Sequence, residues 1–467
     1  MKLSKKKVFA LALAVCLLAT LSLGTLAWFT AQDEVTNNFY VAGSEDLNPD
    51  EVFSIDVWED KDLADNGEAK IQDGIDYEAI LPGDDLYKEV NIENTGAYAQ
   101  YVRAIVTVSD ASIWQQLNGD VYVPLNKIAT DLNTKFQTWS ITYNADEDEL
   151  TYVLYFDEIL PAEGADIVTL FTNIHISEDM TREQAAKMAG GFVINVVAEA
   201  VQTEHVGNSA SEAFETVGKK REAGNSTVMT TAAGLEKVLT SGAVSEVTLP
   251  AELAGQSVTF DYDISNVTIN AAEQNVAMTF TGKLENVTVT GIKDNGDATP
   301  ALTITKTASG DLTVKDSYFY DEKPAPYGGI AGNGTATDLS LTVDNCTIEG
   351  ARPLYLTNMN NLTVTNTTFK GVSGGSWTIM LNGTVTGNIV VDGCTFEGCT
   401  GILKAGVSGG QDWQTGTTGN ITFTNNVLNN NNLKDGKLFA TNSVGTVTVS
   451  GNTGNTTENA DWTNGLN

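Results

Sequence analysis

The chain is poor in histidine, cysteine and proline, and its basic residues are few. It has 2 histidines, 4 cysteines and 9 prolines in 467 residues, and 26 basic residues against 60 acidic ones. A zinc hydrolase needs clustered ligands, yet His175 and His205 are the only histidines and no HExxH motif is present. The formal charge of −34 excludes nucleic acid and anionic membranes as partners.

The one long apolar run stands at the N-terminus. Four lysines within residues 2–7 precede the run 8–23, and small residues follow it. This layout predicts a secretory signal peptide over residues 1–27, cleaved between Ala27 and Trp28. A retained membrane anchor is the alternative, but the run is short of the about 20 residues that a membrane span needs. No membrane contact is expected after processing. Cleavage removes four lysines and no acid, so the formal charge changes from −34 to −38.

A repeated pattern dominates the second half of the chain. LTVDNCTIEG at 341–350, LTVTNTTFKG at 362–371 and IVVDGCTFEG at 389–398 are three copies of it, and weaker copies lie on both sides. Successive copies start 20 to 32 residues apart, which is the period of a solenoid. Apolar residues two apart face the same side of a short strand.

Each copy also contains a residue suited to a sharp turn. Asn345, Asn366 and Asn425 occupy the same slot, which Gly393 fills in its own copy, and both residue types tolerate the left-handed conformation. Strand, turn and strand repeated in one direction predict a parallel β-helix over residues 229–467. A β-sandwich is the alternative, but it would need antiparallel hairpins.

The solenoid has a predicted cover at its start. Within TTAAGLEKVLTSGAVSEVTLP (230–250), Leu235, Val238 and Leu239 fall on one helical face, so a short amphipathic helix is expected to shield the first coil. This pattern resembles right-handed parallel β-helix proteins of the pectate-lyase-like class, in architecture only.

Residues 44–205 predict a different β structure. Alternating apolar residues mark several strands, each buried mainly on one face, and acidic loops join them. One helix is expected after Asp110, and another that begins with the capping pair Thr181 and Gln184. The segment 207–228 has no sustained apolar period and is interpreted as a linker.

Three segments of the first half carry a family resemblance. WFTAQDEVTNNFYVAG (28–43), LPGDDLYKEVNIENTGAYAQYVRAIVTV (81–108) and FVINVVAEAVQTEH (192–205), in this order behind a signal peptide, resemble the TasA/camelysin family. The resemblance implies a jelly-roll-like β-sandwich over 28–206 and export through a SipW-type signal peptidase. It also implies secretion into the biofilm matrix or onto the cell surface of a Gram-positive bacterium. The expected fold is therefore all-β, a β-sandwich followed by a right-handed parallel β-helix.

The segment after the cleavage site has apolar residues suited to strand exchange, namely Phe29, Val35, Phe39 and Val41. Added to the open sheet edge of another copy, it would build a filament, because head-to-tail addition does not close. The alternative is that the segment folds back as the first strand of its own sandwich.

Candidate chemistry in the solenoid is sparse. Asp344 and Asp392 share an outward slot two coils apart, within the range of a glycosidase acid pair, but Thr365 lies between them. Cys346 and Cys394 are about 9–10 Å apart by strand spacing, too far for a disulfide. A Cys394–Cys399 bridge is geometrically conceivable.

Exposed aromatic residues on a repetitive face suit sugar binding. Trp377, Trp413 and Tyr355 are the candidate glycan contacts, with Trp413 in the long loop 406–420 preferred. The acidic stretch 58–76 is a candidate Ca²⁺ loop, but it lacks EF-hand spacing, so a solvated loop is preferred and no cofactor is expected.

Three functions follow. The first is a non-catalytic matrix or surface protein that assembles through its sandwich and displays the β-helix. The second is a secreted polysaccharide-degrading enzyme, and the third is an adhesin or glycan-binding module. The lack of a convincing catalytic site favours the first and third.

Overall fold

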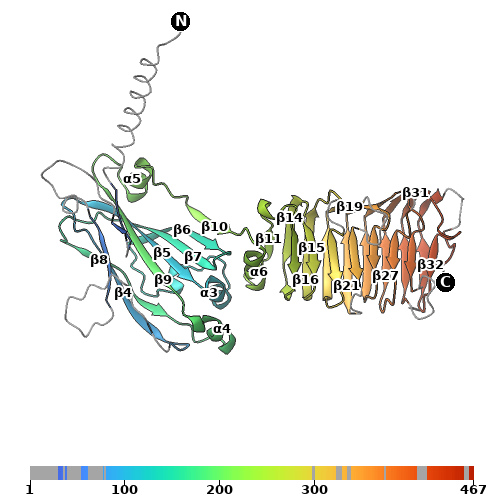
Figure 1. Ribbon diagram of the computed structural model, residues 1–467, viewed down its shortest axis with the longest axis horizontal. Coiled ribbons are helices and arrows are strands. Elements are labelled where there is room, and N and C mark those ends of the chain that lie inside the picture. Colours follow the sequence, from blue (N-terminus) through green and yellow to red (C-terminus); the bar gives the residue numbers. More distant parts are fainter. Residues whose placement is uncertain are drawn as a thin grey trace, which may run out of the picture. The chain divides into compact units, whose positions relative to one another are not determined.

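The computed structural model describes residues 30–34, 37–38, 54–60, 77, 80–296, 300–321, 329–333, 338–372, 375–406, 418–456 and 462–466. The chain divides into two compact units, Met1–Val228 and Met229–Asn467, and each has its own β-sheets (Figure 1). The protein is therefore all-β, with short helices.

The first unit contains two sheets. The larger has the strand order β10-β6-β7-β5-β9-β1-β2 and is antiparallel except where β10 joins β6. The smaller is antiparallel, in the order β3-β4-β8. Their bounds are β1 Thr30–Glu34, β2 Asn37–Asn38, β3 Asp56–Asp60, β4 Asp85–Glu93, β5 Gln100–Ser109, β6 Phe136–Asn144, β7 Glu149–Phe156, β8 Ile167–His175, β9 Ile194–Gln202 and β10 Gly224–Val228.

The predicted helices of the first unit are confirmed. Helix α3 (Ala111–Asn118) ends at the left-handed Gly119, and α4 (Arg182–Lys187) starts with a capping box between Thr181 and Gln184. Single-turn 3₁₀ helices lie at Leu125–Lys127 (η2) and Met188–Gly190 (η3).

The central strand β5 differs from the sequence prediction, because it is buried on both faces. Val102, Ala104 and Val106 on one face are fully buried, as the alternation predicts. On the other face Tyr101 and Arg103 are also buried, at 8% and 2% exposed. Helix α5 (Ala210–Thr216) packs on this second face through Ala213 and Phe214, which share a core cluster with Tyr101.

The interpretation of residues 207–228 as a linker is wrong. This segment contains α5, whose Phe214 is fully buried, and β10, which pairs in parallel with β6 from Gly224 to Val228. The polar composition misled the prediction because few of its side chains pack inward and β10 is held by backbone hydrogen bonds, with all five residues exposed.

The second unit is a stack of parallel strands in three sheets, which is the arrangement of a parallel β-helix. Figure 1 shows the strands side by side in chain order. The ten-stranded sheet contains β11 Glu246–Thr248, β13 Ile264–Ser265, β14 Thr268–Gln274, β16 Lys283–Ile292, β18 Ser309–Lys315, β21 Leu339–Asp344, β24 Asn361–Thr365, β27 Ile389–Asp392, β30 Ile421–Thr424 and β33 Val447–Ser450.

Two further sheets run through the stack, and the six-stranded one begins only at β19. The eight-stranded sheet contains β12 Ser257–Phe260, β15 Ala277–Phe280, β17 Leu302–Thr305, β20 Ile330–Asn333, β23 Leu354–Leu356, β26 Ile379–Leu381, β29 Leu403–Ala405 and β32 Phe439–Thr441. The six-stranded sheet contains β19 Tyr318–Asp321, β22 Thr347–Gly350, β25 Thr368–Gly371, β28 Thr395–Glu397, β31 Val427–Asn431 and β34 Thr453–Thr456.

The repeat positions behave as the sequence predicts. Asn345, Asn366 and Asn425 have φ of 49°, 50° and 57°, and Gly393 in the same slot has φ of 65°. The inward residues stack coil on coil; the rings of Phe369 and Phe396, for example, lie parallel with centroids 5.1 Å apart.

The start of the stack is covered as expected. Helix α6 (Ala232–Thr240) begins at Thr231, whose side chain accepts from the Gly234 N–H, and buries Leu235, Val238 and Leu239. It contacts β12 and β13 in the first coils, and the 3₁₀ turn η4 (Ala251–Leu253) precedes β12. In the described part of the chain, no helix is long and apolar enough to cross a membrane.

Candidate functional sites

The N-terminal strand lies against the larger sheet of the first unit. Strand β1 pairs antiparallel with β9, with Thr30 opposite Val201 and Asp33 opposite Ala198, and β2 follows at the sheet edge. In this chain the segment therefore takes the folded-back arrangement over Thr30–Glu34. The predicted exchange residues Phe29, Val35, Phe39 and Val41 lie outside the described residues, as do the predicted cleavage residues Ala27 and Trp28.

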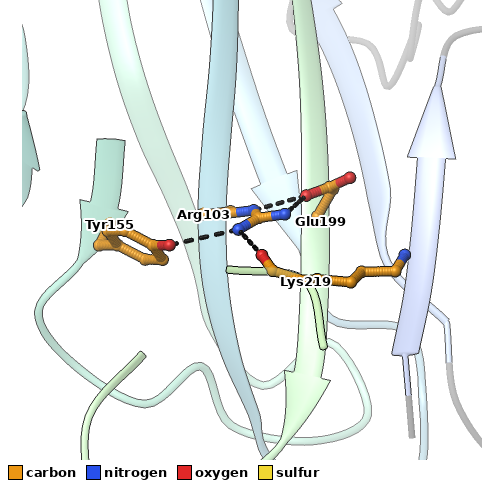
Figure 2. Close-up of polar contacts among 4 residues, drawn as sticks. All are labelled: Arg103, Tyr155, Glu199 and Lys219. Atoms are coloured by element: carbon orange, nitrogen blue, oxygen red, sulfur yellow. Dashed lines mark hydrogen bonds and ion pairs between the residues drawn. The ribbon is translucent and has the colours of Figure 1, made fainter. Parts of the chain in front are cut away.

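A buried ion pair fastens α5 to the sheet. Arg103 on β5 lies directly opposite Glu199 on β9, and its guanidinium donates to the Glu199 carboxylate through Nε and Nη2 (Figure 2). Nη1 donates to the Lys219 carbonyl at 2.8 Å and to the Tyr155 hydroxyl at 3.2 Å. The Phe214 ring from α5 lies over the guanidinium, with Cζ 4.1 Å from the centroid.

This cluster was not anticipated, although the sequence contains its signal. Arg103 and Glu199 are of opposite sign, and each is the single charged residue of its strand. Nothing in the sequence alone shows that the two strands are neighbours or that residues 210–219 close over the pair. The cluster is a structural clamp, since its charges and donors are taken up by one another.

The two candidate catalytic carboxylates are used in the solenoid's own hydrogen bonding. Asp344, Thr365 and Asp392 do occupy one outward column in successive coils, as predicted. The Thr365 hydroxyl donates to Asp344 Oδ1 at 2.6 Å, and the Asn366 side chain donates to the same oxygen at 2.9 Å. These two hydrogen bonds lower the pKa of Asp344, which opposes a general-acid role.

Asp392 repeats this arrangement two coils further along. It accepts from the Thr424 hydroxyl at 2.6 Å and from the Asn425 side chain at 2.8 Å. Each acid therefore ties its own coil to the next through a threonine and a turn asparagine.

The three described cysteines are free and buried, so the conceivable Cys394–Cys399 disulfide is not formed. Each thiol lies 3.5–3.6 Å from a backbone carbonyl oxygen of the preceding coil: Val314 for Cys346, Val364 for Cys394 and Phe369 for Cys399. Burial raises the pKa of each thiol from 9.0 to about 12. These residues fill small core positions and are poor nucleophiles.

The predicted glycan contacts differ in how far the structure buries them. Trp377 is only 6% exposed and its ring packs closely against Gly401, so burial removes it as a stacking surface. Tyr355 is half-buried at the outward position of β23. Trp413 lies outside the described residues.

The outer face of the eight-stranded sheet holds a lysine that sequence reasoning missed. Lys404 at the centre of β29 follows Tyr355 and Met380 in one outward column, yet it is only 6% exposed. Burial lowers its pKa and the nearby Arg352 charge lowers it further, whereas Asp435 acts in the opposite direction. The Arg352 guanidinium lies 6.0 Å from the Tyr355 ring centroid.

The histidines and acids give no metal centre in the part of the chain that the structure describes. His175 Nδ1 lies 2.7 Å from Asp85 Oδ1, an exposed pair, and no group of three or more His, Cys, Asp or Glu side chains converges there. Most of the candidate Ca²⁺ stretch 58–76 lies outside the described residues. Its Glu59 is buried and pairs with Lys88.

Comparison with known proteins gives no further assignment: no family model, curated protein or solved structure matches the chain.

Proposed function

We propose that this chain is a secreted, non-catalytic structural protein of an extracellular matrix or cell surface, which assembles through its first unit and displays the solenoid for contact with glycans. The proposal includes a Gram-positive bacterium as the source and a SipW-type signal peptidase as the processing partner, and the resemblance to the TasA/camelysin family supports both. The jelly-roll-like sandwich and the right-handed turn of the solenoid are parts of the same proposal.

The observation that carries the proposal is the attachment of β1. This strand adds to β9 through backbone pairing over four residue pairs, from Thr30–Val201 to Asp33–Ala198. Backbone pairing is available to any strand of the same register, so a second copy can supply the strand in place of the chain's own. Exchange that runs from one copy to the next gives a filament, since nothing closes the series.

The solenoid supports a display role more than an enzymatic one. Its outward acids Asp344 and Asp392 are committed to hydrogen bonds between coils. Its inward residues stack tightly, so the long outer faces are the surfaces left for contact with other molecules.

Light scattering tests the assembly. The protein that starts at Trp28 is compared with a version that starts at Gly43, across pH and salt. The formal charge of −38 opposes association at low ionic strength, so the longer protein should grow into large species as salt rises or pH falls, while the shorter one stays monomeric. Equal behaviour of the two, or monomers throughout, would leave a monomeric surface protein instead.

A further inference from the structure

The first unit contains a cavity of about 340 Å³ on the face of the larger sheet that carries α5. Ser140 and Thr142 on β6 and Thr151 and Val153 on β7 line it from the sheet, and residues 220–226 line it from the side. Val153 also belongs to the core cluster around α5, so the cavity lies next to the packed part of this face.

Two hydrogen bonds hold the segment that forms the side of the cavity. The Lys219 carbonyl accepts from Arg103 at 2.8 Å (Figure 2), and the Arg221 carbonyl accepts from the Trp139 indole N–H at 2.7 Å. Strand β10 then pairs with β6 through its backbone. The cavity is therefore shaped by the fold before any ligand arrives, which lowers the cost of binding.

The floor of the cavity combines hydroxyl groups with one apolar side chain. Ser140 and Val153 lie opposite each other and are 7% and 3% exposed. Thr142 and Thr151 form the next row, and the Thr151 hydroxyl donates to Glu149 Oε1 at 3.3 Å. A hydroxyl also accepts hydrogen bonds, so Thr151 keeps the capacity to bind a donor.

The charges around the cavity are balanced. Lys220 pairs with Glu215 at 3.1 Å, and Arg221 is followed by Glu222 at the rim. An anion would meet the Glu222 carboxylate, and an apolar ligand would take water away from the hydroxyl groups without replacing it. A neutral molecule that both donates and accepts hydrogen bonds fits this lining best.

We propose that this cavity binds a neutral sugar, a mono- or disaccharide. Ser140, Thr142 and Thr151 exchange hydrogen bonds with its hydroxyl groups, and Val153 lies under the apolar face of the ring. The volume of about 340 Å³ is at the lower end of small-molecule sites, which suits a short sugar. The inference goes beyond the proposed function, because it places a sugar site on the first unit, whereas the proposed glycan contact is on the solenoid.

The test is isothermal titration of the mature protein that starts at Trp28. The probes are glucose, galactose, N-acetylglucosamine and maltose, with sodium sulfate as the anion. At least one of the sugars should bind with a Kd of about 1 mM or below, the level that a few hydrogen bonds provide. Failure of all four sugars to bind would overturn the proposal, and sulfate that binds more tightly than every sugar would identify an anion site instead.

Two variants locate the binding. Thr151→Val keeps the shape of the side chain and removes its hydroxyl, and Ser140→Ala does the same at the floor, so each should weaken binding about threefold to tenfold. Thr138→Val is the matched control, because Thr138 is an exposed residue of β6 that does not line the cavity. Unchanged binding in both cavity variants, or an equal loss in the control, would place the sugar elsewhere and overturn the site.

A third variant fills the cavity without a change in the sheet interior. Ser226 lines the cavity from the exposed strand β10, so Ser226→Tyr should abolish binding and leave the thermal unfolding midpoint unchanged. Full binding in Ser226→Tyr would contradict the proposal even if Ser140→Ala failed to fold. Titration reports nothing on filament growth, and light scattering of the same variants reports nothing on sugar, so the site and the assembly can fail separately.

Discussion

Removal of the Arg103 side chain is the sharpest test of how the first unit is held together. In Arg103→Met, Glu199 stays buried at 4% exposed and loses the guanidinium that neutralises it. The Lys219 carbonyl and the Tyr155 hydroxyl each lose a donor, and Phe214 loses its cation contact. The change therefore acts on the sheet and on the segment that follows α5.

The expected magnitude follows from burial. Breaking a buried ion pair by removal of one partner costs about 3–5 kcal/mol, because an uncompensated charge remains. Replacement of both charges in Arg103→Met/Glu199→Met removes that penalty, so the double variant should regain most of the lost stability. The exposed Lys135–Glu158 pair gives the control, since its loss in Lys135→Met should leave the urea midpoint nearly unchanged.

Two measurements report how far Arg103→Met destabilises the first unit. Urea titration monitored by tryptophan fluorescence gives the free energy of unfolding of the first unit. Brief trypsin digestion reports release of the 219–223 segment, where cleavage should be faster in Arg103→Met than in the double variant. The reasoning is refuted if Arg103→Met costs less than about 1 kcal/mol, or if the double variant is as unstable as the single one.

Four further outcomes are expected. Val364→Asp should unfold the second unit at much lower urea than Thr363→Asp, because Val364 is fully buried between coils and a carboxylate there costs several kcal/mol; equal urea midpoints would mean that the inward and outward positions are misassigned. The three buried thiols should react slowly with a thiol reagent at pH 8 until the protein is unfolded. Because burial raises their pKa to about 12, the second unit should also lose stability as pH rises from about 9 toward 12. A pH series of urea titrations measures this trend, and its absence would indicate that the thiols are exposed. N-terminal sequencing of exported protein should begin at Trp28, and a start at Met1 would indicate an anchored protein.

The solenoid was the part of the fold most open to prediction. Its strands repeat the same apolar spacing, and the turn slot requires Asn or Gly for a left-handed conformation, so Asn345, Asn366 and Gly393 fix the register from the sequence alone. The covering helix α6 was visible for the same reason, as a periodic apolar face.

The features that the sequence did not predict depend on contacts between segments that are distant in the chain. Phe214 belongs to a polar stretch, and only the folded unit shows that it covers the face of β5 around Arg103. Lys404 likewise looks like an ordinary solvated lysine until its burial and its place beside Arg352 are known. Trp377 shows the reverse error, since a tryptophan that was expected to be exposed is part of the core.

Binding of the isolated N-terminal segment tests the central claim most directly. A synthetic peptide of residues 28–42 is added to the protein that starts at Gly43, and hydrogen exchange of the β9 backbone amides is followed. The account predicts saturable binding and slower exchange at Ala198, Ala200 and their neighbours, because the peptide takes the place of β1. Peptide that does not bind, or that leaves exchange in β9 unchanged, would contradict assembly by strand exchange.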